Sequence, residues 1–186
     1  MERSKCKIQT NWYVLTGGPC TGKTTMVNML ATQGYKTTIE HARHYIDSQR
    51  ENGENVEEIR ANKKKFQEGV LDMQIEEEMG LNPQDTVFLD RAIPDAMAYY
   101  QFLNLEYDKK LLDAMELFCY KKIFILDRLP LVNDYARRED IEEQTRIHNL
   151  IIKVYESLPC PTVFVPVLSP VERMNFIIDN IITKLG

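Results

Sequence analysis

The stretch Trp12–Thr25, WYVLTGGPCTGKTT, decides the fold of this chain. Its first five residues form a short apolar run, and the eight residues Gly17–Thr24 (GGPCTGKT) fit the pattern GxxxxGK[ST] in full. In this pattern the glycines let backbone N–H groups turn inward around phosphate groups, and the helix that follows adds the positive end of its dipole. A helical pattern over Lys23–Gly34 supplies that helix. The stretch therefore predicts a phosphate-binding loop between a strand and a helix.

Two residues at the end of the loop have expected roles in binding a nucleoside triphosphate. Lys23 is expected to reach the β- and γ-phosphates, and the hydroxyl of Thr24 is expected to ligate Mg²⁺. A Gly-rich turn without a ligand is the alternative, which the flanking strand and helix disfavour. The predicted nucleotide-binding residues are Gly17, Gly18, Pro19, Cys20, Thr21, Gly22, Lys23, Thr24 and Thr25.

Outward from the loop, apolar blocks alternate with helical patterns. Continuous rather than alternating apolarity is typical of strands buried on both faces of a parallel sheet. Long helices are expected from the Asn55-x-x-Glu58 cap towards Gly80, over 141–158, and after the capping box Ser169–Glu172. Five strands with helical crossovers predict a three-layer α/β/α domain with a parallel sheet, spanning residues 1–186 as one unit. The expected strands are Trp12–Thr16, Lys36–Glu40, Thr86–Asp90, Lys122–Asp127 and Thr162–Val167.

Composition narrows the classes of partner. The chain has 186 residues and a formal net charge of −5. That balance argues against a nucleic-acid polymer as the main partner, although a few local cations suffice for a small phosphorylated ligand. No apolar run approaches the length of a membrane span, and the first ten residues hold no apolar signal segment. The four cysteines form no CxxC pair, so we expect a cytoplasmic protein with free thiols and no membrane association.

Charged residues follow two of the other predicted strands. The carboxyl ends of parallel strands meet at one edge of a sheet, so Glu40, Asp90 and Arg91 are expected near the loop. Asp90 closes the run TVFLD, as in a Walker B motif, and is a candidate Mg²⁺ ligand. Glu40 is a candidate to accept the proton of an attacking hydroxyl or to help hold Mg²⁺, and Arg91 to clamp a phosphate. The structural alternatives are a turn-capping Asp90, a surface Glu40 that begins a helix, and an Arg91 paired with a neighbouring acid.

The least regular segment, Leu129–Asp140, follows a predicted strand and holds two arginines. We interpret residues 128–140 as a short lid over the site. On closure, Arg137 would bring a cation to the charge that develops during phosphoryl transfer. Between the lid and the loop, an acceptor pocket is expected from Glu40–Tyr45, the helix that carries Phe66 and Gln67, and the segment Asp90–Tyr100, with Phe66 itself assigned mainly to core packing.

A phosphate-binding loop alone does not choose between a kinase, a switch and a motor. Neither a DxxG after Asp90 nor an NKxD-type base reader occurs, which disfavours a GTPase, and an AAA+ motor is expected to be longer. The remaining class is a small-molecule kinase that transfers the γ-phosphate of Mg-ATP to a hydroxyl-bearing acceptor, such as a nucleoside or vitamin-like compound. ATP is the expected nucleotide and GTP remains open. The alternative is a module whose partner binding depends on ATP or GTP and which hydrolyses the nucleotide slowly.

Several segments together resemble one family. Thr16–Thr25, Glu40–Arg43 (EHAR), Phe66-Gln67 and Phe88–Tyr100 (FLDRAIPDAMAYY) are similar to the AAA_28 group. Its P-loop domains are similar to the ribosylnicotinamide-kinase domain of NadR and to the ATPase domain of the TRPL translocation defect protein 14. The resemblance implies an ATP- or GTP-binding domain with a nucleotide-kinase-like fold, and it assigns the Walker B acid to Asp90 and the following arginine to Arg91. The lid departs from the Asp-Gly-x-Arg of relatives, because Tyr135 replaces the glycine.

Overall fold

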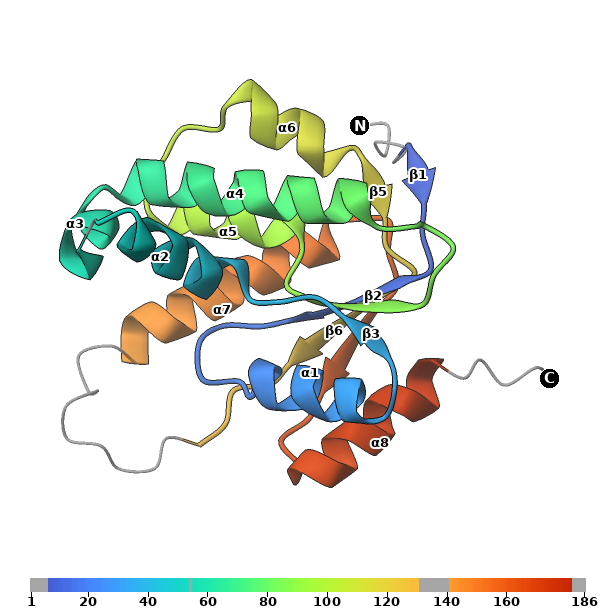
Figure 1. Ribbon diagram of the computed structural model, residues 1–186. Coiled ribbons are helices and arrows are strands. Elements are labelled where there is room, and N and C mark those ends of the chain that lie inside the picture. Colours follow the sequence, from blue (N-terminus) through green and yellow to red (C-terminus); the bar gives the residue numbers. More distant parts are fainter. Residues whose placement is uncertain (1–6, 54, 131–140, 182–186) are drawn as a thin grey trace.

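A five-stranded parallel sheet lies at the centre of the computed structural model, which describes residues 7–53, 55–130 and 141–181 (Figure 1). Every neighbouring pair of strands is parallel, and the order across the sheet is β3-β4-β2-β6-β7. The predicted five-stranded parallel sheet is therefore confirmed. The strands are β2 (Trp12–Thr16), β3 (Lys36–Thr37), β4 (Val87–Asp90), β6 (Lys122–Leu126) and β7 (Thr162–Val165).

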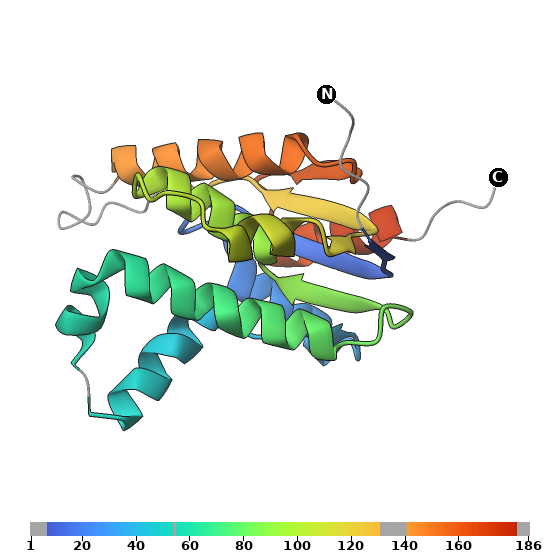
Figure 2. The same cartoon turned by 90° about the horizontal axis from the view of Figure 1, so that it is seen from above.

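Helices cover both faces of this sheet and complete three layers. The views in Figures 1 and 2 place α1 and α8 on one face and α4, α5 and α7 on the other. Helices α2 and α3 pack against α4, and α6 packs against α5. The predicted three-layer α/β/α architecture is confirmed. The helices are α1 (Lys23–Thr32), α2 (His41–Glu51), α3 (Val56–Ala61), α4 (Lys63–Gly80), α5 (Ile93–Phe102), α6 (Lys109–Met115), α7 (Ile141–Glu156) and α8 (Pro170–Ile181).

The central strand β2 shows why the apolar runs are continuous. All five of its residues are buried. Trp12 and Val14 belong to the core beneath α4, α5 and α7, whereas Tyr13 and Leu15 belong to the core beneath α1 and α8. Strand β7 differs, because it lies at the edge of the sheet and Phe164 is 43% exposed. The expectation that this strand is buried on both faces is therefore wrong.

The long helix expected between Asn55 and Gly80 is two helices. The side chain of Asn55 accepts a hydrogen bond from the backbone N–H of Glu58 at 2.8 Å and caps α3, as predicted. Asn62 then leaves the helical region with φ −87° and ψ 75°, and its side chain accepts from the N–H of Lys65 at 3.1 Å. A residue that caps a helix cannot also continue one, so α3 ends at Ala61 and α4 begins at Lys63.

Two features at the amino ends of β2 and β6 differ from expectation. The two-residue strands β1 (Ile8–Gln9) and β5 (Phe118–Cys119) form a second, parallel sheet. Cys119 is disulfide-bonded, so the expectation of free thiols is wrong at this position, whereas Cys20 and Cys160 are free. Within the described ranges, every helix is too short or too polar to span a membrane.

Candidate functional site

The loop Gly17–Gly22 lies at the carboxyl edge of the sheet, between the end of β2 and the first turn of α1. Gly17 adopts φ +138°, and a Cβ there would lie 2.8 Å from the carbonyl oxygen of Leu126. Gly22 precedes α1 in the left-handed region with φ +81°. Side chains other than hydrogen are strained in such conformations. The first and last glycines of the motif are therefore required by the path of the chain itself.

The ammonium of Lys23 is folded into this loop. Its Nζ donates to the carbonyls of Gly17 (3.0 Å) and Gly18 (2.7 Å) and to Oγ1 of Thr21 (3.1 Å). Lys23 is only 8% exposed. Burial, together with the charge of Arg91, lowers the pKa of Lys23 to about 7. A cation that is desolvated in this way gains more from a phosphate than an exposed one does, because the phosphate replaces the missing water.

Asp90 ends the strand next to the loop and is paired in register with Leu15 of β2. Asp90 is 2% exposed, and its backbone N–H donates a hydrogen bond to Oγ1 of Thr38 at 2.9 Å. Its side-chain oxygen Oδ1 has no hydrogen-bond partner among the described residues. Burial raises the pKa of Asp90, against the opposing charges of Arg91 and Lys23. The arrangement places a buried, unpaired carboxylate oxygen beside the loop.

These residues can be tested for their fit to Mg²⁺. Among the residues that the structure describes, no group of three His, Cys, Asp or Glu side chains could hold a metal ion alone. Mg²⁺ is usually held by one or two carboxylates together with the phosphates of a nucleotide, and it needs no all-protein cage. The unpaired oxygen of Asp90 and the exposed Thr24, at the second position of α1, fit an ion that arrives with a nucleotide.

Arg91 follows Asp90 in a left-handed conformation, with φ +68°. Its backbone N–H donates to the carbonyl of Leu15 at 3.0 Å, which holds this strained turn against β2. The guanidinium pairs with Asp95 at 2.7 Å and lies over the ring of Tyr99, 5.4 Å from its centroid. The alternative interpretation, an ion pair with a neighbouring acid, is therefore realised, but the arginine also lines the cavity described below.

Asp95 connects the parts of the site, and sequence reasoning assigned it no role. Besides Arg91, it accepts hydrogen bonds from the hydroxyls of Thr16 (2.7 Å) and Tyr155 (2.5 Å) and from the N–H of Ala92 (3.1 Å). It thereby links the end of β2, the turn after β4 and helix α7. The signal available in the sequence was an acid in the first turn of a helix after Pro94, which is common enough to be uninformative.

Glu40 is the residue before α2 and is half-buried. Its carboxylate lies 4.0 Å from the guanidinium of Arg43, one turn along the helix, and this side chain of Glu40 is 30% exposed. Glu40 therefore begins a helix, as the structural alternative expects, and it also lines the cavity described below, while its proposed role as proton acceptor or Mg²⁺ ligand stays a prediction.

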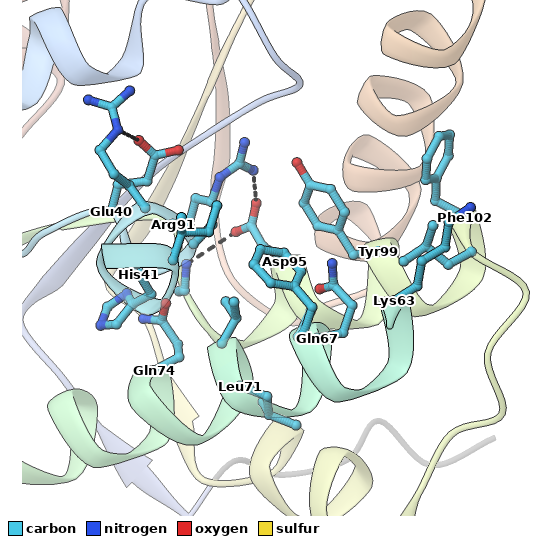
Figure 3. A pocket seen from close by; sticks show the side chains of 18 of the residues that line it. Glu40, His41, Lys63, Gln67, Leu71, Gln74, Arg91, Asp95, Tyr99 and Phe102 are labelled. Atoms are coloured by element: carbon cyan, nitrogen blue, oxygen red, sulfur yellow. Dashed lines mark hydrogen bonds and ion pairs between the residues drawn. The ribbon is translucent and has the colours of Figure 1, made fainter. Parts of the chain in front are cut away.

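A cavity of about 630 Å³ opens between α2, α3, α4 and α5. Figure 3 shows Glu40 and Arg91 towards one end and Lys63 and Phe102 towards the other, with Gln67, Asp95 and Tyr99 between them. The lining includes residues of all three segments expected to form an acceptor pocket. Phe66, which was assigned mainly to core packing, is half-buried and also lines the cavity. Residues from α3 and the carboxyl end of α5, such as Val56 and Phe102, were not expected in this wall.

Arg173 on α8 is a second residue that sequence reasoning missed. It is 2% exposed, and its guanidinium donates to the carbonyls of Thr21 (2.6 Å), Asp127 (2.8 Å) and Pro166 (2.8 Å). It therefore ties the phosphate-binding loop to the ends of β6 and β7, and adds a positive charge behind the loop. Its only signal in the sequence is its spacing, four residues before the buried Ile177 on the apolar stripe of α8.

The structure brings Lys23, Glu40, Asp90 and Arg91 to one region, since the charges of Glu40, Asp90 and Arg91 all act on Lys23. Arg137, and with it most of the predicted lid, lies outside the described residues.

Comparisons with known proteins agree with this architecture. A deoxyadenosine kinase from M. mycoides is 15% identical, with a TM-score of 0.62 over 91% of this chain and 97% of its own. The NadR protein in complex with NR is 17% identical, with a TM-score of 0.65 over 95% of this chain and 54% of its own, so this chain spans about half of it. A thymidylate kinase from Ehrlichia chaffeensis is 15% identical, with a TM-score of 0.63 over 97% of this chain and all of its own. At these identities the likeness shows the fold, which is that of the nucleotide kinases.

Sequence comparison is more specific. A search of curated proteins found no match. The sequence profile of the AAA_28 family, described as an AAA domain, matches residues 12–173 and so extends from the first strand of the central sheet into its last helix. That match includes the phosphate-binding loop, Asp90, Arg91 and the walls of the cavity. The chain belongs to the AAA_28 family of P-loop domains.

Proposed function

We propose that this protein is a kinase that transfers the γ-phosphate of Mg-ATP to a hydroxyl group of a small molecule. The observation that carries the proposal is that a phosphate-binding loop and a cavity lie next to each other at the carboxyl edge of the sheet. A phosphate-binding loop with a buried Lys23 lies within electrostatic reach of Glu40 and Arg91, and these two residues line a cavity of about 630 Å³. Ligand pockets for small molecules are typically of this size. A simple NTPase needs the loop but not the cavity.

The residues of the chain divide the reaction between them. The cavity would hold the acceptor so that its hydroxyl oxygen attacks the γ-phosphorus, while the bond from that phosphorus to the oxygen bridging the β- and γ-phosphates breaks and ADP leaves. Glu40 would take the proton of the hydroxyl, since it lines the cavity and Asp90 does not. Lys23 and Arg91 would stabilise the charge on the transferred group. Mg²⁺, held by Thr24 and Asp90, would neutralise charge on the phosphates.

The walls of the cavity favour an acceptor that carries an aromatic or heteroaromatic ring. Phe66, Tyr99 and Phe102 supply aromatic surface. Gln67 is 7% exposed, lines the cavity, and forms no side-chain hydrogen bond within the described ranges. Its amide offers one donor face and one acceptor face to a ligand. A nucleoside or vitamin-like compound with a ring, a polar edge and a free hydroxyl matches these features.

A slow nucleotide-dependent binding module is the second candidate. The partial exposure of Glu40 favours it, because water can reach the proton acceptor as readily as an organic hydroxyl can. Arg137 belongs to both candidates as the cation of a lid over about residues 128–140, and the whole chain would act as a single nucleotide-binding domain in either.

The test is a panel of nucleosides and vitamin-like alcohols, each assayed for ADP or GDP release with Mg-ATP or Mg-GTP. The kinase proposal expects at least one compound to raise release at least tenfold above the hydrolysis background. Glu40→Gln should abolish that increase, whereas Glu76→Gln, an exposed carboxylate on α4, serves as the matched control and should preserve it. A flat panel with measurable background hydrolysis would favour the binding module.

A further inference from the structure

A histidine on α7 contacts the phosphate-binding loop from outside the motif. Nδ1 of His148 accepts a hydrogen bond from the backbone N–H of Gly18 at 3.0 Å, and His148 is 7% exposed. The two residues are packed so closely that a Cβ on Gly18 would lie 2.8 Å from the Cβ of His148. The second glycine of the motif is therefore fitted to this helix.

The same residue of the loop also orients Lys23. The carbonyl of Gly18 accepts from Nζ of Lys23 at 2.7 Å and from Oγ1 of Thr21 at 3.1 Å. His148 thus holds the N–H side of Gly18 while Lys23 holds its carbonyl side. The imidazole of His148 and the ammonium of Lys23 therefore contact the same residue, so a change at the imidazole that moves Gly18 also moves the acceptor of Lys23.

This contact requires a neutral imidazole. Nδ1 can accept a hydrogen bond only when the ring proton is on Nε2, and a protonated ring presents a donor at Nδ1 to the donor N–H of Gly18. The charged groups that act on the ring are Arg128 after β6 and Lys23 at the start of α1, which oppose protonation, and Asp127, which favours it. Burial, with Arg128 and Lys23, lowers the pKa of His148 below its usual value, so the ring is neutral at pH 7.

We propose that His148 is a positioning residue of the phosphate-binding loop, and that its protonation releases Gly18 and weakens nucleotide binding. This inference rests on the proposed role of the loop in binding a nucleoside triphosphate. It goes beyond that role by assigning a loop-positioning function to a residue of α7 that lies outside the motif. It also predicts that the affinity for nucleotide falls at acid pH as His148 becomes protonated.

Two substitutions separate the hydrogen bond from the imidazole. His148→Asn places an amide oxygen close to the position of Nδ1, where it can accept from Gly18 but cannot titrate. His148→Gln places its amide one bond further out, towards the position of Nε2, and loses the bond. Affinity for Mg-ATP is measured by titration calorimetry from about pH 5.5 to pH 8, with thermal melts at each pH to confirm folding. The quantity compared is the ratio of wild-type to His148→Asn affinity, which cancels the titration of the nucleotide and of Lys23.

The inference predicts that this ratio falls from pH 7.5 to pH 5.5, by less than about tenfold, because the pKa of His148 lies below its usual value and protonation is only partial at pH 5.5. It also predicts that His148→Gln binds about tenfold more weakly than His148→Asn at pH 7.5. His44→Asn, which changes an exposed histidine of α2, should follow the wild-type pH profile. If His148→Gln does not fold, Gly18→Ala should weaken binding by the same route, because its Cβ displaces His148, with Gly80→Ala in open space as the control.

A ratio that stays flat while the wild type binds Mg-ATP would overturn the inference and leave the proposed function intact. Equal affinities for the asparagine and glutamine variants at neutral pH would also overturn it. A wild-type protein that binds no nucleotide at any pH would overturn the proposed function and the inference together.

Discussion

The phosphate-binding loop and the acceptor cavity lie at the same edge of the sheet but are built differently. The loop is six consecutive residues between β2 and α1, and its shape depends on backbone groups and glycines. The cavity is walled by side chains from four successive helices, α2 to α5, whose lining residues are scattered over residues 40–103. Phosphate is a constant ligand that a local motif can recognise, whereas an acceptor is recognised by a set of side chains that only tertiary packing assembles. The comparison predicts that substitutions in the two regions affect different ligands.

The largest effect is expected for Lys23→Ala in the loop. The substitution removes the cation that is proposed to contact the phosphates, so we expect nucleotide turnover to fall by about 10² to 10³. Initial-rate assays and Mg-ATP titrations measure it, with Lys153→Ala on the exposed side of α7 as the matched control. Unchanged nucleotide affinity in Lys23→Ala would remove the loop from the account.

Asp95→Asn should affect both regions, because Asp95 lines the cavity and accepts a hydrogen bond from Thr16, the residue just before the loop. The substitution leaves Arg91 without its buried partner, and breaking a buried ion pair costs about 3 kcal/mol of unfolding free energy. Chemical denaturation measures this loss. Affinity for nucleotide and for acceptor should decline together. The control is Asp113→Asn, whose ion pair with Lys109 is exposed and which should change stability by less than about 0.5 kcal/mol. A loss confined to one ligand would show that the two regions are not coupled here.

Gln67→Leu should affect acceptor binding and leave nucleotide binding unchanged, because Gln67 lines the cavity and lies on α4, outside the loop. Loss of its amide should raise the KM for the acceptor about tenfold, the effect of one or two hydrogen bonds to a buried ligand. The affinity for Mg-ATP should not change. Steady-state kinetics with each substrate varied in turn measure both, and Gln49→Leu, on α2 but outside the cavity wall, serves as control. An equal effect on both substrates would contradict the assignment.

The smallest effect on ligand binding is expected at Glu78 of α4, which lies outside the loop and is not among the residues that line the cavity. It is fully buried and accepts hydrogen bonds from Tyr120 (2.8 Å), Gln74 (2.7 Å) and the N–H of Ile93 (3.0 Å). Burial raises the pKa of Glu78 to about 8. The folded state therefore holds the proton that the unfolded state loses near pH 4.5, so the contribution of Glu78 to stability is complete below pH 4.5 and declines as pH rises to about 8.

Glu78→Gln removes this dependence. Denaturation curves at several pH values between about 4.5 and 8 should show the variant gaining on the wild type with each step, by at most about 1.4 kcal/mol per pH unit. Parallel curves for the two proteins would mean that Glu78 is already ionised in the folded state.

The fold could be predicted from the sequence because its signals are local. The strand β2 and the loop after it follow from fourteen consecutive residues, Trp12–Thr25, and the other strands follow from short apolar blocks. The errors arose where a local signal was ambiguous. Asn62 sits in a helical pattern yet caps a new helix, and β1 and β5 are too short to show any periodicity.

The candidate site could be predicted only in part. Glu40, Asp90 and Arg91 follow strands, so the geometry of a parallel sheet places them together without further knowledge. Asp95, His148 and Arg173 could not be assigned in this way, because their partners lie 79, 130 and 152 residues away. A buried polar residue within an apolar helical stripe was the only signal for the last two, and such a residue does not reveal what it contacts.

The central claim is that the loop and the cavity are two halves of one phosphoryl-transfer site. Following the label from [γ-³²P]ATP tests it most directly, with the acceptor that the compound panel identifies. The account predicts that the label appears on the acceptor in the wild type, and that Glu40→Gln loses this transfer while still binding Mg-ATP. Label found only in inorganic phosphate, with every compound of the panel unlabelled, would contradict it.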